Sequence, residues 1–218
     1  MSSVAAPYVR ASYPPPPFAA SFLVAAEARP NRQATSPRVT AALIDPGFFD
    51  AGLVDLIEGN GLEITKVLIT HDHPAHTHGL ATVVRAYGPA IYAGQDKVAG
   101  LDAVPLGNGE RIDVGDIELE AIALYGDAGE VLAFRLDDLL FSGPAISAGE
   151  VGTTASPEAA ARQQQALRER VATLPGRTRI LAGHGPPTTV ALELAFNPAF
   201  RSPPPQPATS ETAPEAGS

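Results

Sequence analysis

Short apolar segments separated by turn residues run through most of the chain, and their spacing predicts alternating strands and helices. Apolar segments of this length, many with β-branched residues, are typical of buried strands. The predicted strands are Phe22–Val24, Val39–Ile44, Lys66–Ile69, Ala90–Tyr92, Val131–Leu136, Leu139–Phe141 and Arg179–Ala182. Apolar and charged residues alternate over Ile117–Ile122, as in a strand with one face in water. Asp137 and Asp138 predict a tight turn between two strands.

Three segments show helical spacing of their apolar residues. They are Phe49–Gly59, Gly79–Ala86, and a longer segment from Ser156 to about Leu174. In the longest, Ser156 is suited to cap the helix and Pro157 to occupy its first position. Strands and helices in this mixed order predict an α/β (α+β) fold.

The ends of the chain differ in composition from its middle. Residues 1–20 contain four consecutive prolines and predict a flexible segment. Residues 202–218 are rich in proline, contain no large apolar residue and predict a disordered tail. One globular domain is therefore expected over residues 21–201.

Charge and composition exclude several classes of function. The net charge is −9 without a basic run, so we expect no nucleic-acid partner. There is no cysteine, which excludes disulfides, thiolate ligands and a cysteine nucleophile. The longest apolar stretch, Phe18–Ala26, is far shorter than the ~20 residues that span a bilayer. We expect a cytoplasmic protein that acts on a small-molecule substrate, without membrane attachment.

Four of the five histidines lie between Thr70 and Gly79, in the sequence Thr-His-Asp-His-Pro-Ala-His-Thr-His-Gly. A predicted buried strand precedes this segment and a predicted helix follows it. A lone histidine is more often an ordinary hydrogen-bonded residue than a ligand. Four in one strand-to-helix loop, with the fifth in Gly183-His184-Gly185, instead indicate side chains that converge as metal ligands do.

The histidine loop resembles the signature His-x-His-x-Asp-His of the metallo-β-lactamase superfamily. The resemblance extends over about residues 21–200, and the later segments are similar to the glyoxalase II-like branch. The resembling segments are Leu43–Gly47, Leu140–Gly143, Gly149–Gly152, Leu174–Thr189 and Glu193–Pro198. The resemblance implies a four-layer αββα sandwich with a site for one or two metal ions, usually zinc and sometimes iron. In the family, metal-bound hydroxide attacks a thioester, lactone, amide or phosphoester.

Three positions depart from the family pattern, and all three are ligand positions. Ala75 and Pro144 stand where the family has aspartates, and neither side chain carries a donor atom. Asp127 stands where the family has a histidine.

The resemblance assigns the remaining donors to two sites. His71, His73 and Asp127 would form a complete first site, while His76 and His184 alone would remain of the second. We therefore expect a mononuclear centre with one divalent ion, zinc before iron, or no metal if the site has decayed. Asp45 is interpreted as a partner that orients a ligand histidine. Asp72 is expected to point away from the site, and His78 to face solvent.

Three functions follow from this ligand set. The first is a metal-dependent hydrolase of a thioester, lactone or other ester, in which His76 or His184 acts as general acid or base. The second is a catalytically inactive binding protein that keeps the fold. The third is a non-haem iron oxygenase built on His71, His73 and Asp127.

Overall fold

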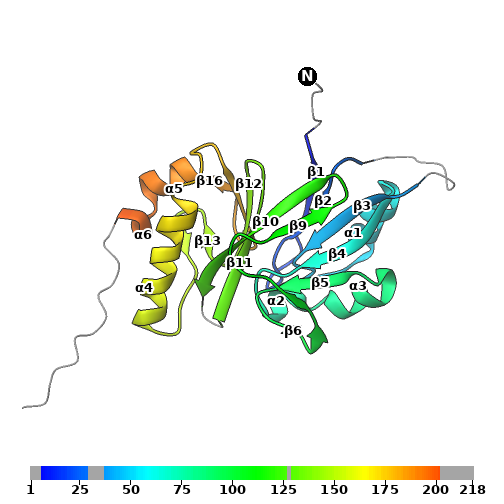
Figure 1. Ribbon diagram of the computed structural model, residues 1–218, viewed down its shortest axis with the longest axis horizontal. Helices are drawn as coiled ribbons and strands as arrows, with labels where there is room; N and C mark the ends of the chain where they lie inside the picture. Colours follow the sequence, from blue (N-terminus) through cyan, green and yellow to red (C-terminus); the bar gives the residue numbers. More distant parts are fainter. Residues whose placement is uncertain (1–5, 29–36, 127–128, 202–218) are drawn as a thin grey trace, which may run out of the picture.

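The computed structural model describes residues 6–28, 37–126 and 129–201. Two mixed sheets face each other, with helices α1 and α3 outside one sheet and α4 and α5 outside the other (Figure 1). This is the four-layer αββα arrangement expected from the family resemblance.

The first sheet has six strands in the order β1-β2-β3-β4-β5-β8. Strands β1 to β3 are antiparallel, and β3, β4, β5 and β8 are parallel. The bounds are β1 Tyr8–Ser12, β2 Ser21–Ala25, β3 Val39–Ile44, β4 Leu62–Leu68, β5 Ala90–Ala93 and β8 Val104–Pro105.

The second sheet has the order β16-β15-β12-β11-β10-β9, and only its β12–β15 pair is parallel. Its bounds are β9 Arg111–Val114, β10 Ile117–Gly126, β11 Gly129–Leu136, β12 Leu139–Gly143, β15 Arg179–Ala182 and β16 Thr188–Thr189. Two small hairpins are added: β6 Lys97–Val98 with β7 Leu101–Asp102, and β13 Ile146–Ser147 with β14 Glu150–Val151.

Four of the helices begin after a residue whose side chain caps them. The bounds are α1 Ala51–Gly59, α2 Pro74–Thr77, α3 Leu80–Tyr87, α4 Pro157–Ala166, α5 Val190–Phe196 and α6 Pro198–Arg201. Asp50 accepts a hydrogen bond from Leu53 N at the start of α1, and Ser156 from Ala159 N at the start of α4. Each satisfies a backbone donor that the first helical turn leaves free.

Three apolar clusters fill the spaces between the layers. The central cluster lies between the sheets and includes Phe22, Phe134 and Phe141. A second cluster joins the first sheet to α1 and α3, and a third joins the second sheet to α4. No helix within the described ranges is both long and apolar enough to cross a membrane.

The structure differs from the sequence expectation near the N-terminal end of the chain. The predicted flexible segment 1–20 contains β1, which pairs with β2 along its whole length, and Ala19 and Ala20 are buried. Expecting flexibility there was therefore wrong for Tyr8–Ser12. The predicted tail 202–218 lies outside the described residues.

The long helix predicted from Ser156 to about Leu174 is also interrupted. After α4 the chain continues as a π-helix over Leu167–Val171, where Ala172 N donates to Leu167 O. The wider turn keeps both Leu167 and Val171 buried against the second sheet.

Candidate active site

Four strands of the two sheets end at one edge of the sandwich, and the histidines lie in the loops that follow. Asp45 follows β3, His71 follows β4 by three residues, and His184 follows β15 by two. Gly183 N donates to Gly143 O, at the end of β12, over 2.9 Å. This contact connects the loop carrying His184 to the neighbouring strand end.

Asp45 and His76 form a buried pair at the centre of the site. Both residues are 1% exposed. The Asp45 carboxylate accepts hydrogen bonds from Thr70 N at 2.8 Å, from Thr70 Oγ1 at 2.6 Å and from His76 Nδ1 at 2.9 Å. Because an ionised carboxylate only accepts, Nδ1 carries the proton, and in the neutral ring Nε2 keeps its lone pair. Asp45 is thus hydrogen-bonded to a histidine of the loop, and the role of this histidine as a metal ligand stays a prediction.

His76 lies between His71 and His184. Its ring centroid is 6.0 Å from that of His71 and 5.6 Å from that of His184, and both contacts are edge-on. His73 stacks on His71, with ring centroids 5.9 Å apart. The structure therefore brings together four of the predicted site residues.

Burial lowers the pKa of His71 and of His184 below the ordinary histidine value, and the neighbouring His76 lowers both further. Both rings are thus held in the neutral form near pH 7, with a lone pair available for a proton or an ion.

Two polar residues of the same loop lie apart from the cluster. The Asp72 carboxylate accepts from Gln95 Nε2 and Ala99 N, which turns it away from the histidines as expected. His78 is exposed, and its ring contacts Phe18 with centroids 5.2 Å apart.

Comparison with solved structures identifies the architecture. A metallo-beta-lactamase from Staphylococcus aureus subsp. aureus COL superposes with a TM-score of 0.75 at 23% identity, covering 91% of this chain and 64% of that one. TTHA1623, solved in a di-iron-bound form, superposes with a TM-score of 0.68 at 28% identity, covering 87% of this chain and 98% of that one. This chain has the metallo-β-lactamase fold.

Sequence comparison agrees with this fold. The family model of the metallo-beta-lactamase superfamily matches residues 40–102, which include the histidine loop. A hydroxyacylglutathione hydrolase from Xanthomonas euvesicatoria pv. vesicatoria is 31% identical over 150 residues, which are 66% of this chain and 56% of that protein. One from Chromohalobacter salexigens is 30% identical over 158 residues, 70% of this chain and 59% of that protein. The matched region thus spans little more than half of these relatives, and the resemblance to the superfamily is confirmed.

In this metallo-β-lactamase fold, the two positions without side-chain donor atoms have different surroundings. Ala75 is buried on α2, and its carbonyl accepts a hydrogen bond from Ala19 N at 2.9 Å. Pro144 lines a small cavity beside His71. Neither side chain offers a donor atom to an ion.

The described residues alone do not fit a metal ion. No group of three or more histidine, aspartate or glutamate side chains in the described part of the chain is arranged to hold one. His73 Nδ1 accepts from Ala75 N at 3.2 Å at the start of α2, so in its neutral ring the proton is on Nε2 and the remaining lone pair is already used. Asp127, the third donor of the predicted first site, lies outside the described residues.

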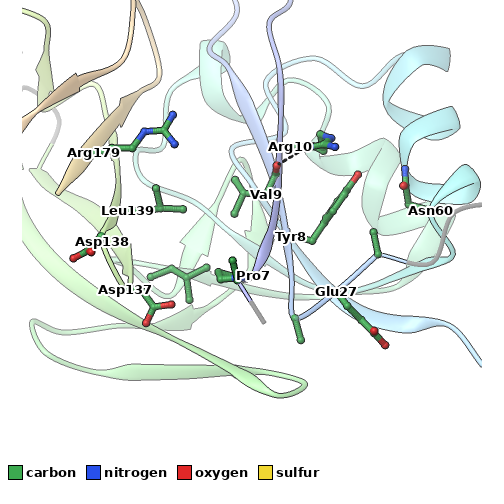
Figure 2. Close-up of a pocket in the computed structure, with 14 residues that line it drawn as sticks. Pro7, Tyr8, Val9, Arg10, Glu27, Asn60, Asp137, Asp138, Leu139 and Arg179 are labelled. Carbon is green, nitrogen blue, oxygen red and sulfur yellow. Dashed lines mark hydrogen bonds between the residues drawn. The ribbon is translucent and has the colours of Figure 1, made fainter. Parts of the chain in front are cut away.

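Two of the cavities in the described part of the chain lie near opposite edges of the sandwich. The small one, about 70 Å³, is bounded by His71 and, from α4, by Gln163. The larger one, about 1100 Å³, is lined by residues at the other ends of the strands, including Arg10, Asp138 and Arg179 (Figure 2). Of the clustered histidines, His71 lines the small cavity.

Gln163, which lines the small cavity with His71, is a residue that sequence analysis did not single out. The available signal was its spacing, three residues before Ala166 and four before Leu167. This spacing places it on the face where the helix buries its apolar residues.

Proposed function

We propose that this protein hydrolyses a small acyl thioester or related ester at the histidine cluster, with His76 as the general base. The observation that carries the proposal is the buried pair of Asp45 and His76. A buried carboxylate on Nδ1 holds the ring in one tautomer and orientation, and it stabilises the imidazolium formed when Nε2 takes a proton.

The reaction follows from this arrangement. His76 Nε2 removes a proton from a water molecule, and the water oxygen adds to the acyl carbon of the substrate. When the carbon–sulfur or carbon–oxygen bond breaks, the leaving group takes the proton back from the histidine cluster. His184 is exposed and neutral near pH 7, so it is placed to pass this proton between His76 and the leaving group.

The choice of an acyl thioester is supported by the relatives named hydroxyacylglutathione hydrolase. Because the chain spans little more than half of those proteins, the substrate is part of the proposal. A small-molecule substrate and a cytoplasmic location belong to it as well.

A single divalent ion remains a prediction. His71, His73 and Asp127 would hold it, and a bound zinc or iron ion would supply Lewis-acid chemistry. The iron oxygenase depends on the same set of residues. Elemental analysis of the purified protein tests both hypotheses. About one equivalent of metal, lost in His71→Ala, supports the site, whereas equal metal content in both proteins contradicts it.

A second candidate is a catalytically inactive binding protein. It is favoured by Ala75 and Pro144, which remove two family carboxylates, and by His73, whose Nδ1 lone pair is used within α2.

Hydrolysis of a panel of glutathione thioesters, with EDTA or with added zinc, separates the two candidates. We expect turnover by the wild type and its loss in His76→Ala. His78→Ala is the matched control, because its exposed ring lies outside the cluster. A wild type inactive in both conditions would favour the binding protein.

A further inference from the structure

Gln163 is a polar side chain in an apolar position. It is 3% exposed and lies on the buried face of α4, next to Ala166 and Leu167. Its Nε2 has no hydrogen-bond partner among the described residues. A buried donor that gives up water without gaining an acceptor is unfavourable, so its presence requires an explanation.

The cavity beside this amide provides one. Gln163 and His71 line the same space of about 70 Å³, and Val131, Pro144 and Ala145 form an apolar part of the wall. At roughly 30 Å³ for each water, this space holds about two water molecules or a group of similar size.

Gly152 keeps the amide uncovered. A Cβ atom at this position would lie 3.2 Å from Gln163 Nε2 and 2.6 Å from Pro144 O. Any side chain at position 152 would therefore collide with the wall or cover the donor.

We propose that Gln163 forms an acyl-oxygen subsite beside His71, in which its Nε2–H donates to the carbonyl oxygen of a short acyl group. This inference rests on the proposed hydrolase function and specifies its substrate. When water adds to the acyl carbon, negative charge develops on this oxygen, and a buried donor held beside apolar wall residues stabilises it. The cavity volume restricts the acyl group to about the size of acetyl.

The first test compares Gln163→Met with wild type in the hydrolysis of S-acetylglutathione. Methionine keeps the length of the side chain and removes the donor. We expect kcat to fall by about 100- to 1000-fold, as when a donor to a developing oxyanion is lost. Wild type should also prefer the acetyl over the octanoyl thioester, because only the shorter group fits.

Stability distinguishes this role from a structural one. Because the donor has no protein partner, Gln163→Met should unfold at the same or a higher urea concentration than wild type. Gln165→Met, on the exposed side of the same helix, is the control for both measurements. Equal kcat in Gln163→Met and Gln165→Met would overturn the proposal while leaving the hydrolase function intact.

If wild type shows no hydrolysis, acetate binding decides the question independently. In that case the proposed function fails, and the side-chain amide resonances of Gln163 are followed by NMR during titration with acetate. A saturable shift of these resonances, absent for the Gln165 amide, supports the subsite. No shift at Gln163 would mean that the cavity holds only water, which overturns the proposal.

Discussion

Asp45 joins the two ends of the histidine loop, since one carboxylate accepts hydrogen bonds from Thr70 and from His76. The residue adopts a left-handed backbone conformation with φ +50°, which is unusual for a residue with a side chain. Its carboxylate is buried, and its own carbonyl accepts from Ser21 Oγ at 2.6 Å. The position of Asp45 is thus held from both sides, which makes it suitable for fixing the orientation of His76.

Replacing Asp45 by asparagine should reduce hydrolysis by about 10- to 100-fold, the usual cost of losing a partner that orients a site histidine. The amide can accept only through one oxygen, so Thr70 and His76 no longer share a carboxylate, and His76 no longer has a fixed tautomer. The measurement is kcat for thioester hydrolysis, together with the 15N shifts of the His76 ring.

Asp72→Asn is the matched control for this change, because that exposed carboxylate binds Gln95 and Ala99 outside the cluster. If Asp45→Asn were as active as Asp72→Asn, His76 would not be the general base.

The histidine cluster should make stability depend on pH in the metal-free protein. Burial lowers the pKa of His71 and of His184 below 6.5, so the unfolded chain binds more protons than the folded one as the pH falls. The free energy of unfolding is therefore highest above about pH 6.5 and decreases as the pH falls through the lower folded pKa values. Urea unfolding in EDTA at several pH values measures this slope.

The double variant His71→Asn/His184→Asn should have a flatter slope, whereas His78→Asn should keep that of wild type. An unchanged slope in the double variant would contradict the assignment of the pH dependence to these rings.

At the scale of elements, the loop after β3 and the short helix α2 are packed backbone against backbone. A Cβ atom on Gly47 would lie 1.9 Å from Ala75 O, and Gly79 N donates to Pro46 O. Gly47 is therefore required by this close approach.

Gly47→Ala should destabilise the protein by about 1–3 kcal/mol, as overpacking usually does, because α2 must move away from the loop. Gly59→Ala is the control, since a Cβ atom there meets nothing within 4 Å, and it should stabilise by about 0.4–1 kcal/mol. Urea unfolding measures both. Equal stabilities of the two variants would show that α2 can move away from the loop with little loss of stability.

Elements with a strong period or clear caps could be predicted from the sequence, and those that depend on a partner strand could not. Val39–Ile44 forms β3 with the predicted bounds, and Asp137 and Asp138 do connect β11 to β12. Tyr8–Ser12 was missed because its burial comes from pairing with β2 and its neighbouring prolines suggest flexibility. Two-residue strands such as β8 carry no period at all.

The candidate site shows the same division. His71, His73, His76 and His184 could be found because histidine is rare in this chain and their loops follow strands. The role of Asp45 was predicted from the family resemblance. Gln163 could not be found in this way, because only the folded helix shows that its amide is buried beside His71.

At the scale of the whole molecule, the two sheets share one apolar interior. Phe22 on β2 in the first sheet contacts Phe141 on β12 in the second, with ring centroids 5.1 Å apart and both side chains fully buried. Asp45 and His184, which lie on loops after strands of different sheets, keep their relative positions only while this packing holds. The site therefore depends on the contact between sheets.

Phe141→Ala should reduce the free energy of unfolding by about 3–5 kcal/mol, since it removes a large buried ring and leaves a cavity between the sheets. Phe196→Ala on α5 is the matched control: that ring is 71% exposed, and its loss should change stability by no more than about 0.5 kcal/mol. Urea unfolding is followed by circular dichroism and by tyrosine fluorescence. A shared interior requires the two signals to change together in Phe141→Ala as in wild type. Two separate transitions would show that each sheet unfolds independently with its own helices. The contact between Phe22 and Phe141 would then hold the two halves together without making them unfold as one unit.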